Sequence, residues 1–183
     1  MTYGPEIHQR RSIRLKDYDY SSAGAYFVTI CTHDKECWLG DVVNSEIVLS
    51  EIGQIAKALW LEIPQHFENV ILDDFIIMPN HVHGIVLNTD SRRVQLNAPT
   101  KTNYYSTISP KKNTLSVVIR TYKAAVTRAC RKQGFEFFRW QRNYYERIVR
   151  NEKELNRIRK YVVGNPLQWK LDNENPKNWT TEP

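Results

Sequence analysis

The fold is decided by residues 69–87, NVILDDFIIMPNHVHGIVL, which hold two apolar segments separated by a short polar turn. Residues 69–78 and 81–87 are rich in β-branched side chains, a composition typical of strands. Pro79 and Asn80 between them are turn formers. The stretch therefore predicts two antiparallel strands joined by a tight turn.

Three elements are predicted before this pair. Residues 25–32, AYFVTICT, have the composition of a buried strand. Residues 37–49 hold two short apolar pieces, which indicates a hairpin. Ser50 is a favourable N-cap for a helix that extends to about residue 63, and Pro64 is predicted to end it.

Two helices and one strand are predicted after the pair. Residues 114–133 form a long helix with a basic face, which Gly134 ends. Residues 135–140 are predicted as a strand. A capping box at residues 151–154 opens a last helix, which is expected to stop before Pro166.

The predicted order is strand, hairpin, helix, two strands, helix, strand, helix. This order favours an α+β fold with a ferredoxin-like antiparallel sheet and packed helices. We expect a basic arm over residues 1–24 and a single domain over residues 25–170. Residues 89–113 are interpreted as a mobile polar loop and residues 171–183 as a polar tail.

The composition is that of an ordinary globular protein, with 41% hydrophobic and 25% charged residues in a chain of 183. No apolar run reaches the ~18 residues of a membrane span, and the basic N-terminus lacks the apolar stretch of a secretory signal. Cys31, Cys37 and Cys130 form no CxxC pair. We therefore expect a cytoplasmic protein with neither a disulfide framework nor a cysteine zinc site.

The net charge of +6 is unevenly distributed. Residues 111–170 contain 16 Lys or Arg against 4 Asp or Glu, whereas residues 21–110 contain 5 against 10. A basic half with interspersed aromatic residues is suited to nucleic acid. From charge alone, an alternative interpretation stays open, in which the basic residues form helix faces that contact only solvent.

The clearest chemical feature is the pair His81 and His83. Alternate residues of a strand share a face, so both imidazoles project together while Val82 points to the opposite face. Two neutral imidazoles can bind one divalent metal ion if a third ligand, preferably an oxygen, completes the site. The alternative is a pair of histidines that only form hydrogen bonds.

Tyr161 and Asn165 share a face of the last helix, because they are four residues apart. Asn165 can offer an amide oxygen to a metal ion. Tyr161 can offer a phenol, which is a poor nucleophile at neutral pH unless a nearby cation assists it. Alternatively, Tyr161 is an amphipathic residue at the edge of the core, and Asn165 with Pro166 is an ordinary helix end.

These features occur together in a known order. MPNHVHGIV (residues 78–86) and WQRNYYERIVRNEKELNRIRKYVVGNPLQW (residues 140–169) resemble the single-tyrosine HUH transposases of the IS200/IS605-like superfamily. The resemblance is strongest to the branch associated with repetitive extragenic palindromes (REPs), and RRSIRLKDYDYSSAGAYFVTICT (residues 10–32) is similar to the start of that branch. It covers most of residues 10–170 and implies the same ferredoxin-like fold.

The resemblance implies a role for each site residue. His81, His83 and Asn165 would bind Mg²⁺ or Mn²⁺, and Tyr161 would be the nucleophile. The implied activity is metal-dependent cleavage and rejoining of single-stranded DNA near hairpins, through a 5′-phosphotyrosine link with a free 3′-hydroxyl. The protein would lie in the cytoplasm, on the nucleoid when bound to DNA, as a homodimer or a monomer.

The basic residues of the arm, the long helix and the segment before the last helix are the expected DNA contacts, because their charge can position the phosphate backbone. They are Arg10, Arg11, Arg14, Arg120, Lys123, Arg128, Arg139, Arg142, Arg147 and Arg150.

Four alternatives stay open. One is a hydrolase that uses a metal-activated water, which would leave Tyr161 without a role. The same fold could hold DNA hairpins without cutting them, as a regulator. A rolling-circle replication initiator or relaxase could share the site, although such proteins usually carry further domains. Tyr144 or Tyr145, which also lie in basic sequence, could be the nucleophile in place of Tyr161.

Overall fold

A computed structural model describes residues 22–89, 114–172 and 174–178. Its centre is a four-stranded sheet in the order β4 (Val70–Ile77), β5 (His81–Asn88), β1 (Gly24–Cys31) and β6 (Tyr145–Val149). All neighbouring strands are antiparallel. This order is that of the split β-α-β arrangement, so the predicted ferredoxin-like α+β fold is confirmed.

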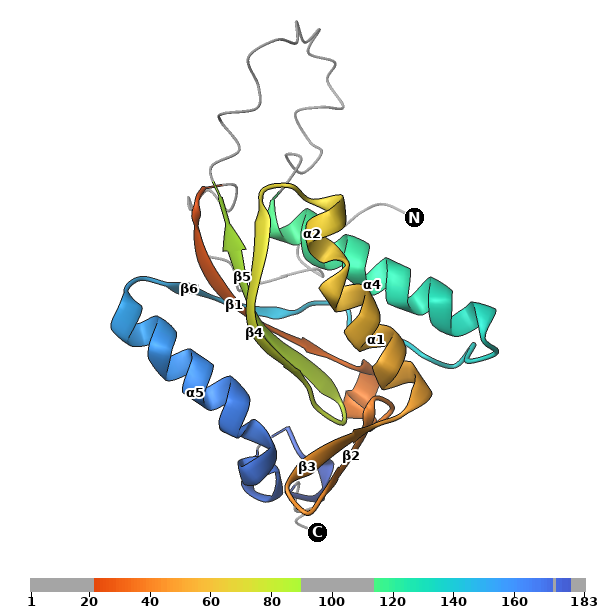
Figure 1. Ribbon diagram of the computed structural model, residues 1–183. Coiled ribbons are helices and arrows are strands. Elements are labelled where there is room, and N and C mark those ends of the chain that lie inside the picture. The colour runs from red at the N-terminus through yellow and green to blue at the C-terminus, as the bar shows by residue number, and fades with distance from the viewer. Residues whose placement is uncertain (1–21, 90–113, 173, 179–183) are drawn as a thin grey trace, which may run out of the picture.

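Helices cover both faces of the sheet (Figure 1). α1 (Glu51–Leu61) and α4 (Leu115–Lys132) lie together on one face, and the short α2 (Ile63–His66) follows α1. α5 (Glu152–Gln168) lies on the opposite face. The larger apolar core is therefore between the sheet and α1 and α4, and a smaller one lies under α5.

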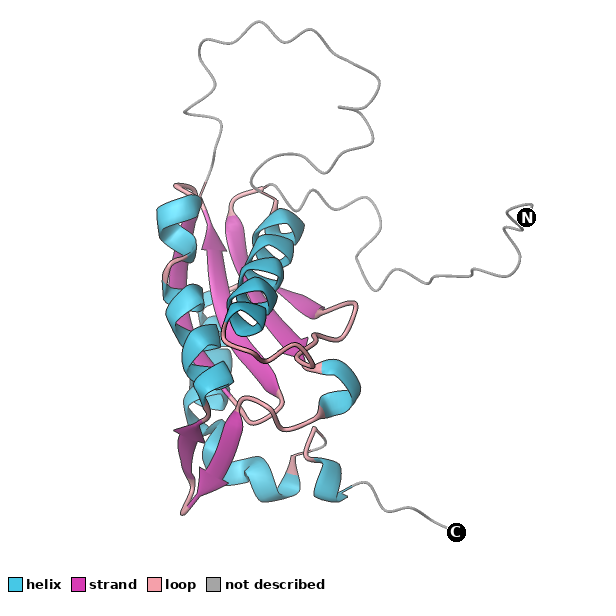
Figure 2. Ribbon diagram, turned by 90° about the vertical axis from the view of Figure 1, so that its right-hand side faces the viewer, coloured by secondary structure: helices cyan, strands magenta, loops and turns pink. Residues whose placement is uncertain are grey.

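The predicted hairpin is β2 (Gly40–Val43) paired with β3 (Glu46–Leu49). Asn44 and Ser45 connect the strands with positive φ angles of 51° and 65°, the conformation of a turn that matches strand twist. Figure 2 shows this hairpin projecting beside the main sheet.

The predicted helix starts are confirmed. The Ser50 hydroxyl accepts a hydrogen bond from the backbone N–H of Gly53 and opens α1. The Asn151 side chain accepts one from the N–H of Glu154 and opens α5. Short 3-10 turns occupy His33–Lys35, Trp169–Leu171 and Pro176–Asn178.

Two predicted helix ends are wrong. α1 ends at Leu61, and Pro64 lies in the first turn of α2, where a missing N–H removes no helical hydrogen bond. α5 does not stop before Pro166 but continues to Gln168. Pro166 lies in its last turns, so the helix continues through it at the loss of one hydrogen bond.

The predicted strand over residues 135–140 is also wrong, because only Trp140 forms an isolated bridge, to Thr32. Phe138 instead packs against Trp38 and Trp140 in an aromatic cluster. The true strand, β6, was missed. Its α5-facing residues, Tyr145 and Arg147, are polar or amphipathic and half exposed, so the strand lacks the apolar alternation of a buried face.

The sheet and α1 approach each other closely at Gly84. A Cβ atom at this position would lie 2.2 Å from Cζ2 of the fully buried Trp60. The indole ring also stacks on Phe75 and meets the edge of Tyr122 from α4. Gly84, one position after His83, therefore sets the spacing between the sheet and its helical layer.

Some predictions lie outside the described residues. Arg10, Arg11, Arg14 and the segment 90–113 are among them. Within the described part of the chain, no helix is long and apolar enough to cross a membrane.

Candidate active site

The sheet register brings both histidines to the face that α5 covers. His81 is opposite Cys31 and His83 is opposite Thr29 in the pairing of β5 with β1. Val82 points to the other face, into the core, as the alternation predicted. The two imidazole rings have centroids 4.3 Å apart, so the pair is a compact cluster at one end of β5.

Hydrogen bonds determine the tautomer of His81. The side-chain amide of Asn80 donates to the carbonyl oxygens of Lys35 and Glu174 at 2.9 and 2.7 Å. Its oxygen therefore faces His81 Nδ1 at 2.8 Å and must accept the proton carried there. The lone pair of His81 Nε2 is left available, and this buried atom has no hydrogen-bond partner among the described residues.

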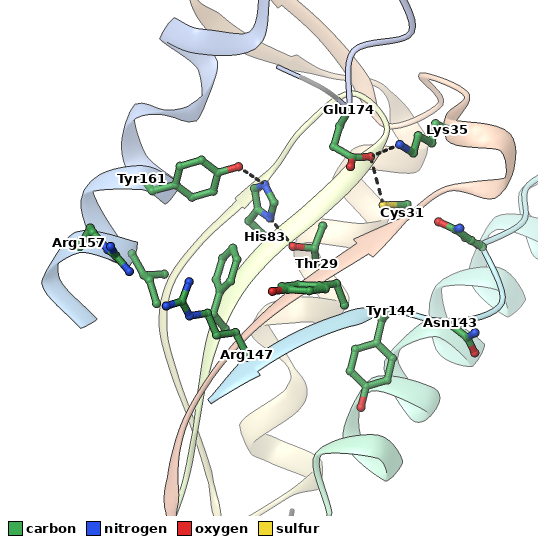
Figure 3. A pocket seen from close by; sticks show the side chains of 14 residues that line it. Thr29, Cys31, Lys35, His83, Asn143, Tyr144, Arg147, Arg157, Tyr161 and Glu174 are labelled. Carbon is green, nitrogen blue, oxygen red and sulfur yellow. Dashed lines mark hydrogen bonds and ion pairs between the residues drawn. The ribbon is translucent and has the colours of Figure 1, made fainter. Parts of the chain in front are cut away.

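His83 connects the sheet to the tyrosine helix. Its Nδ1 lies 2.9 Å from the Thr29 hydroxyl, and its Nε2 lies 3.2 Å from the Tyr161 hydroxyl (Figure 3). A proton on Nδ1 donates to Thr29 and leaves the lone pair of Nε2 facing the phenol. Phe27 packs against both the imidazole and the phenol ring. Tyr161 is thus placed at the histidine pair.

Asn165, one helical turn after Tyr161, is 1% exposed. Its Nδ2 donates to a carboxylate oxygen of Asp172 at 3.4 Å. The side-chain oxygen is buried without a hydrogen-bond donor in the described part of the chain. Asn165 and His81 therefore share a feature: each is held at one end by a hydrogen bond and presents an unpartnered acceptor at the other.

These acceptors fit a divalent cation. No group of three or more His, Cys, Asp or Glu side chains in residues 22–89, 114–172 and 174–178 is arranged to hold one. A mixed set of acceptors could hold one: Nε2 of His81, Nε2 of His83 and the amide oxygen of Asn165. A set of imidazole nitrogens and an amide oxygen suits Mn²⁺. Mg²⁺ prefers oxygen ligands, and it would bind the amide oxygen and complete its coordination with water. A cation on His83 would compete with the Tyr161 hydroxyl for the same lone pair.

Burial controls the charge states of the site. It lowers the pKa of His81 to about 3, with Lys35 acting in the same direction, and lowers the pKa of His83 well below its ordinary value. Both imidazoles are therefore neutral at pH 7, the form that binds metals. Burial also raises the pKa of Tyr161, and the charge of Asp172 adds to this effect. Without a cation, the phenol keeps its proton.

A cavity of about 780 Å³ opens beside the cluster. Its floor is formed by β1 and β6, and α5 contributes Arg157, Ile158 and Tyr161 to one wall (Figure 3). At the other end, Glu174 forms an ion pair with Lys35 at 2.8 Å. The tyrosine is 43% exposed and is therefore accessible from this cavity.

The predicted DNA contacts fall into separate places. A second cavity, of about 790 Å³, lies between α4 and residues 139–142, and its charged lining is basic throughout. Its basic residues are Lys123, Arg128, Arg131, Lys132, Arg139 and Arg142. Arg120 lines a smaller neighbouring cavity, Arg147 lines the cavity beside Tyr161, and Arg150 lines neither of the two large cavities.

Lys123 has a structural role that the amino-acid sequence did not indicate. Its ammonium group donates to the carbonyl oxygens of Gln141, Arg142 and Asn143 at 2.5, 3.2 and 3.3 Å. Burial lowers its pKa to about 8. Lys123 thus fastens the segment before β6, in addition to lining the basic cavity.

Sequence reasoning missed several residues of the site. Asn80 and Thr29 orient the histidines, Asp172 orients Asn165, and Arg157 lines the cavity. Only Asn80 carried a signal, because it directly precedes His81. The others depend on pairing between distant segments.

Comparison with known proteins identifies a close relative. An uncharacterized protein of Haemophilus influenzae is 42% identical over 173 residues, which cover 93% of this chain and 95% of that protein. The chain belongs to the same family as this protein. The family therefore extends over nearly the whole length of both chains. No family model matches the sequence.

Among solved structures, a REP-associated tyrosine transposase bound to a REP hairpin has a similar fold. The match has a TM-score of 0.56 and 17% sequence identity, and covers 85% of this chain and 74% of the other. At this level of identity the similarity concerns the arrangement of the strands and helices.

Proposed function

We propose that this protein is a metal-dependent transposase that cleaves and rejoins single-stranded DNA near hairpins through a 5′-phosphotyrosine intermediate. The observation that carries the proposal is the contact between Tyr161 and His83, beside the unpartnered acceptors of His81 and Asn165. Tyr161 and the neutral His83 line an accessible cavity, and the neutral His81 and the Asn165 amide oxygen, two residues before His83 and four residues after Tyr161, support the assignment.

The chain's own residues account for the covalent step. Tyr161 Oη attacks the scissile phosphorus, and the bond from phosphorus to the 3′-oxygen of the upstream nucleotide breaks. The phenol loses its proton and the departing 3′-oxygen gains one, so a free 3′-hydroxyl and a 5′-phosphotyrosine result. Attack by a 3′-hydroxyl on this link reverses the step and restores both the phosphodiester bond and the phenol.

A cation is assigned to His81, His83 and Asn165. When bound, Mg²⁺ or Mn²⁺ supplies charge neutralisation and polarisation at the scissile phosphate. Asn80, Thr29 and Asp172 hold the three side chains in the required orientation, which is the usual function of residues behind a metal ligand.

Hairpin recognition is assigned to the basic cavity between α4 and residues 139–142. Its cationic side chains are suited to the phosphates of a duplex stem. The similarity in fold to a transposase bound to a REP hairpin supports this part of the proposal.

A covalent-capture assay tests the proposal. Labelled DNA hairpins with single-stranded flanks, taken from the DNA around the gene and from a hairpin library, are incubated with the protein and Mn²⁺ or Mg²⁺. Denaturing electrophoresis should reveal an adduct that chelation prevents and that His81→Ala weakens. Intact hairpin binding without an adduct on any substrate would favour the non-cutting regulator.

A further inference from the structure

α5 covers only part of its face of the sheet. It packs over β4 and β5, and its apolar contacts reach β1 at Phe27 and the end of β6 at Val149. Beyond Phe27 the same face of β1 and β6 forms the floor of the cavity, where Thr29, Tyr145 and Arg147 line it. An open sheet face therefore begins directly beside the candidate nucleophile.

Tyr145 and His83 lie in one row of directly paired residues across the sheet, with Thr29 between them. Thr29 pairs with His83 on one side and with Tyr145 on the other. Since neighbouring strands are about 4.8 Å apart, Tyr145 starts about 10 Å from His83. Its side chain is 55% exposed, although an aromatic ring on a strand normally packs against a core. An exposed ring on a sheet face is the arrangement with which proteins stack unpaired bases.

Two guanidinium groups line the same cavity as this ring. Arg147 lies two residues further along β6, and Arg157 projects from α5 on the same side of the cavity (Figure 3). Both approach one oxygen of Glu154, at 2.6 and 4.0 Å. A single carboxylate cannot neutralise two guanidinium groups, so a positive charge and several N–H donors remain available to phosphates.

The opposite end of the cavity has different chemistry. There His83 lines the cavity beside Tyr161, and the buried acceptors of His81 and Asn165 lie behind it, with Asp172 against Asn165. The Tyr161 hydroxyl thus lies between the acceptor cluster of the histidines and Asn165 and the basic sheet face that carries Arg147. A nucleic acid strand that places one phosphate at Tyr161 must extend over this face.

We propose that the open face of β1 and β6 is a single-strand subsite, in which Tyr145 stacks on a base within two nucleotides of the scissile phosphate and Arg147 and Arg157 bind the flanking phosphates. This inference rests on the proposed function, because it takes the strand at Tyr161 as the substrate. It gives the open face a substrate class, single-stranded DNA, and a residue that contributes to base preference.

The first test measures stacking without cleavage. Full-length protein with Tyr161→Phe is titrated with a short thymidine oligonucleotide that contains one 2-aminopurine. Tyr145→Ala in this background should weaken binding about ten-fold and abolish most of the fluorescence quenching. Tyr145→Phe should retain both, since the ring is kept. Phe137→Ala, which removes an aromatic ring of similar exposure outside the cavity, is the matched control.

The second test concerns the phosphates. Arg157→Gln should reduce the slope of log affinity against log salt by about one, as expected for one lost phosphate contact. Lys153→Gln, on the same helix but outside the cavity lining, should leave the slope unchanged. Normal thermal unfolding of each variant shows that the change is local.

The outcomes separate this inference from the proposed function. Quenching that depends on Tyr145 but no adduct in the capture assay would retain the subsite and reject the strand transferase. An adduct whose formation at low DNA concentration is as fast in Tyr145→Ala as in the wild type would reject the subsite. Equal affinity and quenching in Tyr145→Ala and its parent would also overturn it.

Discussion

The hydroxyl oxygen of Tyr161 lies 3.2 Å from Nε2 of His83, although 78 positions separate the two residues in the chain. Tyr145 is in the same cavity but starts two strands away from His83, and Tyr144 turns towards α4 (Figure 3). Among the three tyrosines considered from the sequence, only Tyr161 contacts the histidine pair.

Tyr161→Phe should therefore abolish the covalent adduct, because it removes the attacking oxygen alone. Hairpin affinity should stay within a few-fold of the wild type, as measured by fluorescence anisotropy. Tyr144→Phe should still form the adduct. An adduct that persists in Tyr161→Phe would show that another side chain is the nucleophile.

Asn80 should control metal affinity without being a ligand. Asn80→Ala removes the acceptor that holds the proton on His81 Nδ1. The proton can then move to Nε2, which removes the lone pair that would bind the metal. Loss of such an orienting residue typically weakens metal binding 10- to 100-fold. Calorimetric titration with Mn²⁺ measures this effect directly and needs no DNA. Asn80→Asp, which keeps the oxygen, should bind Mn²⁺ more tightly than Asn80→Ala; the reverse order would contradict the tautomer assignment.

Gly84→Ala should destabilise the fold, since the new methyl group would overlap the ring of Trp60. Overpacking of this kind costs on the order of 1–3 kcal/mol in the free energy of unfolding, which urea denaturation measures. Gly164→Ala is the matched control, because a Cβ there meets no atom within 4 Å and alanine favours a helix. A neutral Gly84→Ala would mean that Trp60 can move aside.

The ion pair between Asp73 and Arg159 should make stability depend on pH. Arg159 donates from Nε and Nη2 to the two carboxylate oxygens at 3.0 and 2.6 Å, joining α5 to β4. Hydrogen bonding from Arg159 lowers the pKa of Asp73 below the ordinary value of an aspartate. The stabilisation is therefore complete above the unfolded-state pKa and is lost as the pH falls through the lower folded-state value.

Asp73→Asn should accordingly lower the urea midpoint at pH 7, and the difference from the wild type should shrink as the pH falls below the ordinary pKa of an aspartate. A difference that is the same at both pH values would indicate a packing effect unrelated to the charge.

Hairpin binding should decrease steeply with salt if the basic cavity holds phosphates. Arg128→Gln removes one cation from the cavity and should reduce the slope of log affinity against log salt by about one. Lys57→Gln, on the exposed side of α1, should leave it unchanged. Anisotropy titrations between about 50 and 200 mM salt measure both slopes, and a flat response of the wild type would exclude this cavity as the stem site.

Local patterns were sufficient for much of the fold. The turn after Met78, the N-caps Ser50 and Asn151, and the shared face of His81 and His83 all follow from spacing over a few residues. The predictions from sequence were wrong at residues 135–140 and at β6, because tertiary contacts determine the structure there. Apolar residues there pack into an aromatic cluster, while the polar strand faces a cavity.

By itself, the sequence determined the types of chemistry present: two imidazoles on one strand face, and a phenol and an amide on one helix face. Periodicity alone accounts for this, because each pair lies within one element. Only the tertiary structure decided that the two pairs meet. The crossing of α5 over β5 depends on strand pairing and burial between residues far apart in the chain, and so do the contacts of Asn80, Thr29 and Asp172 that orient the site.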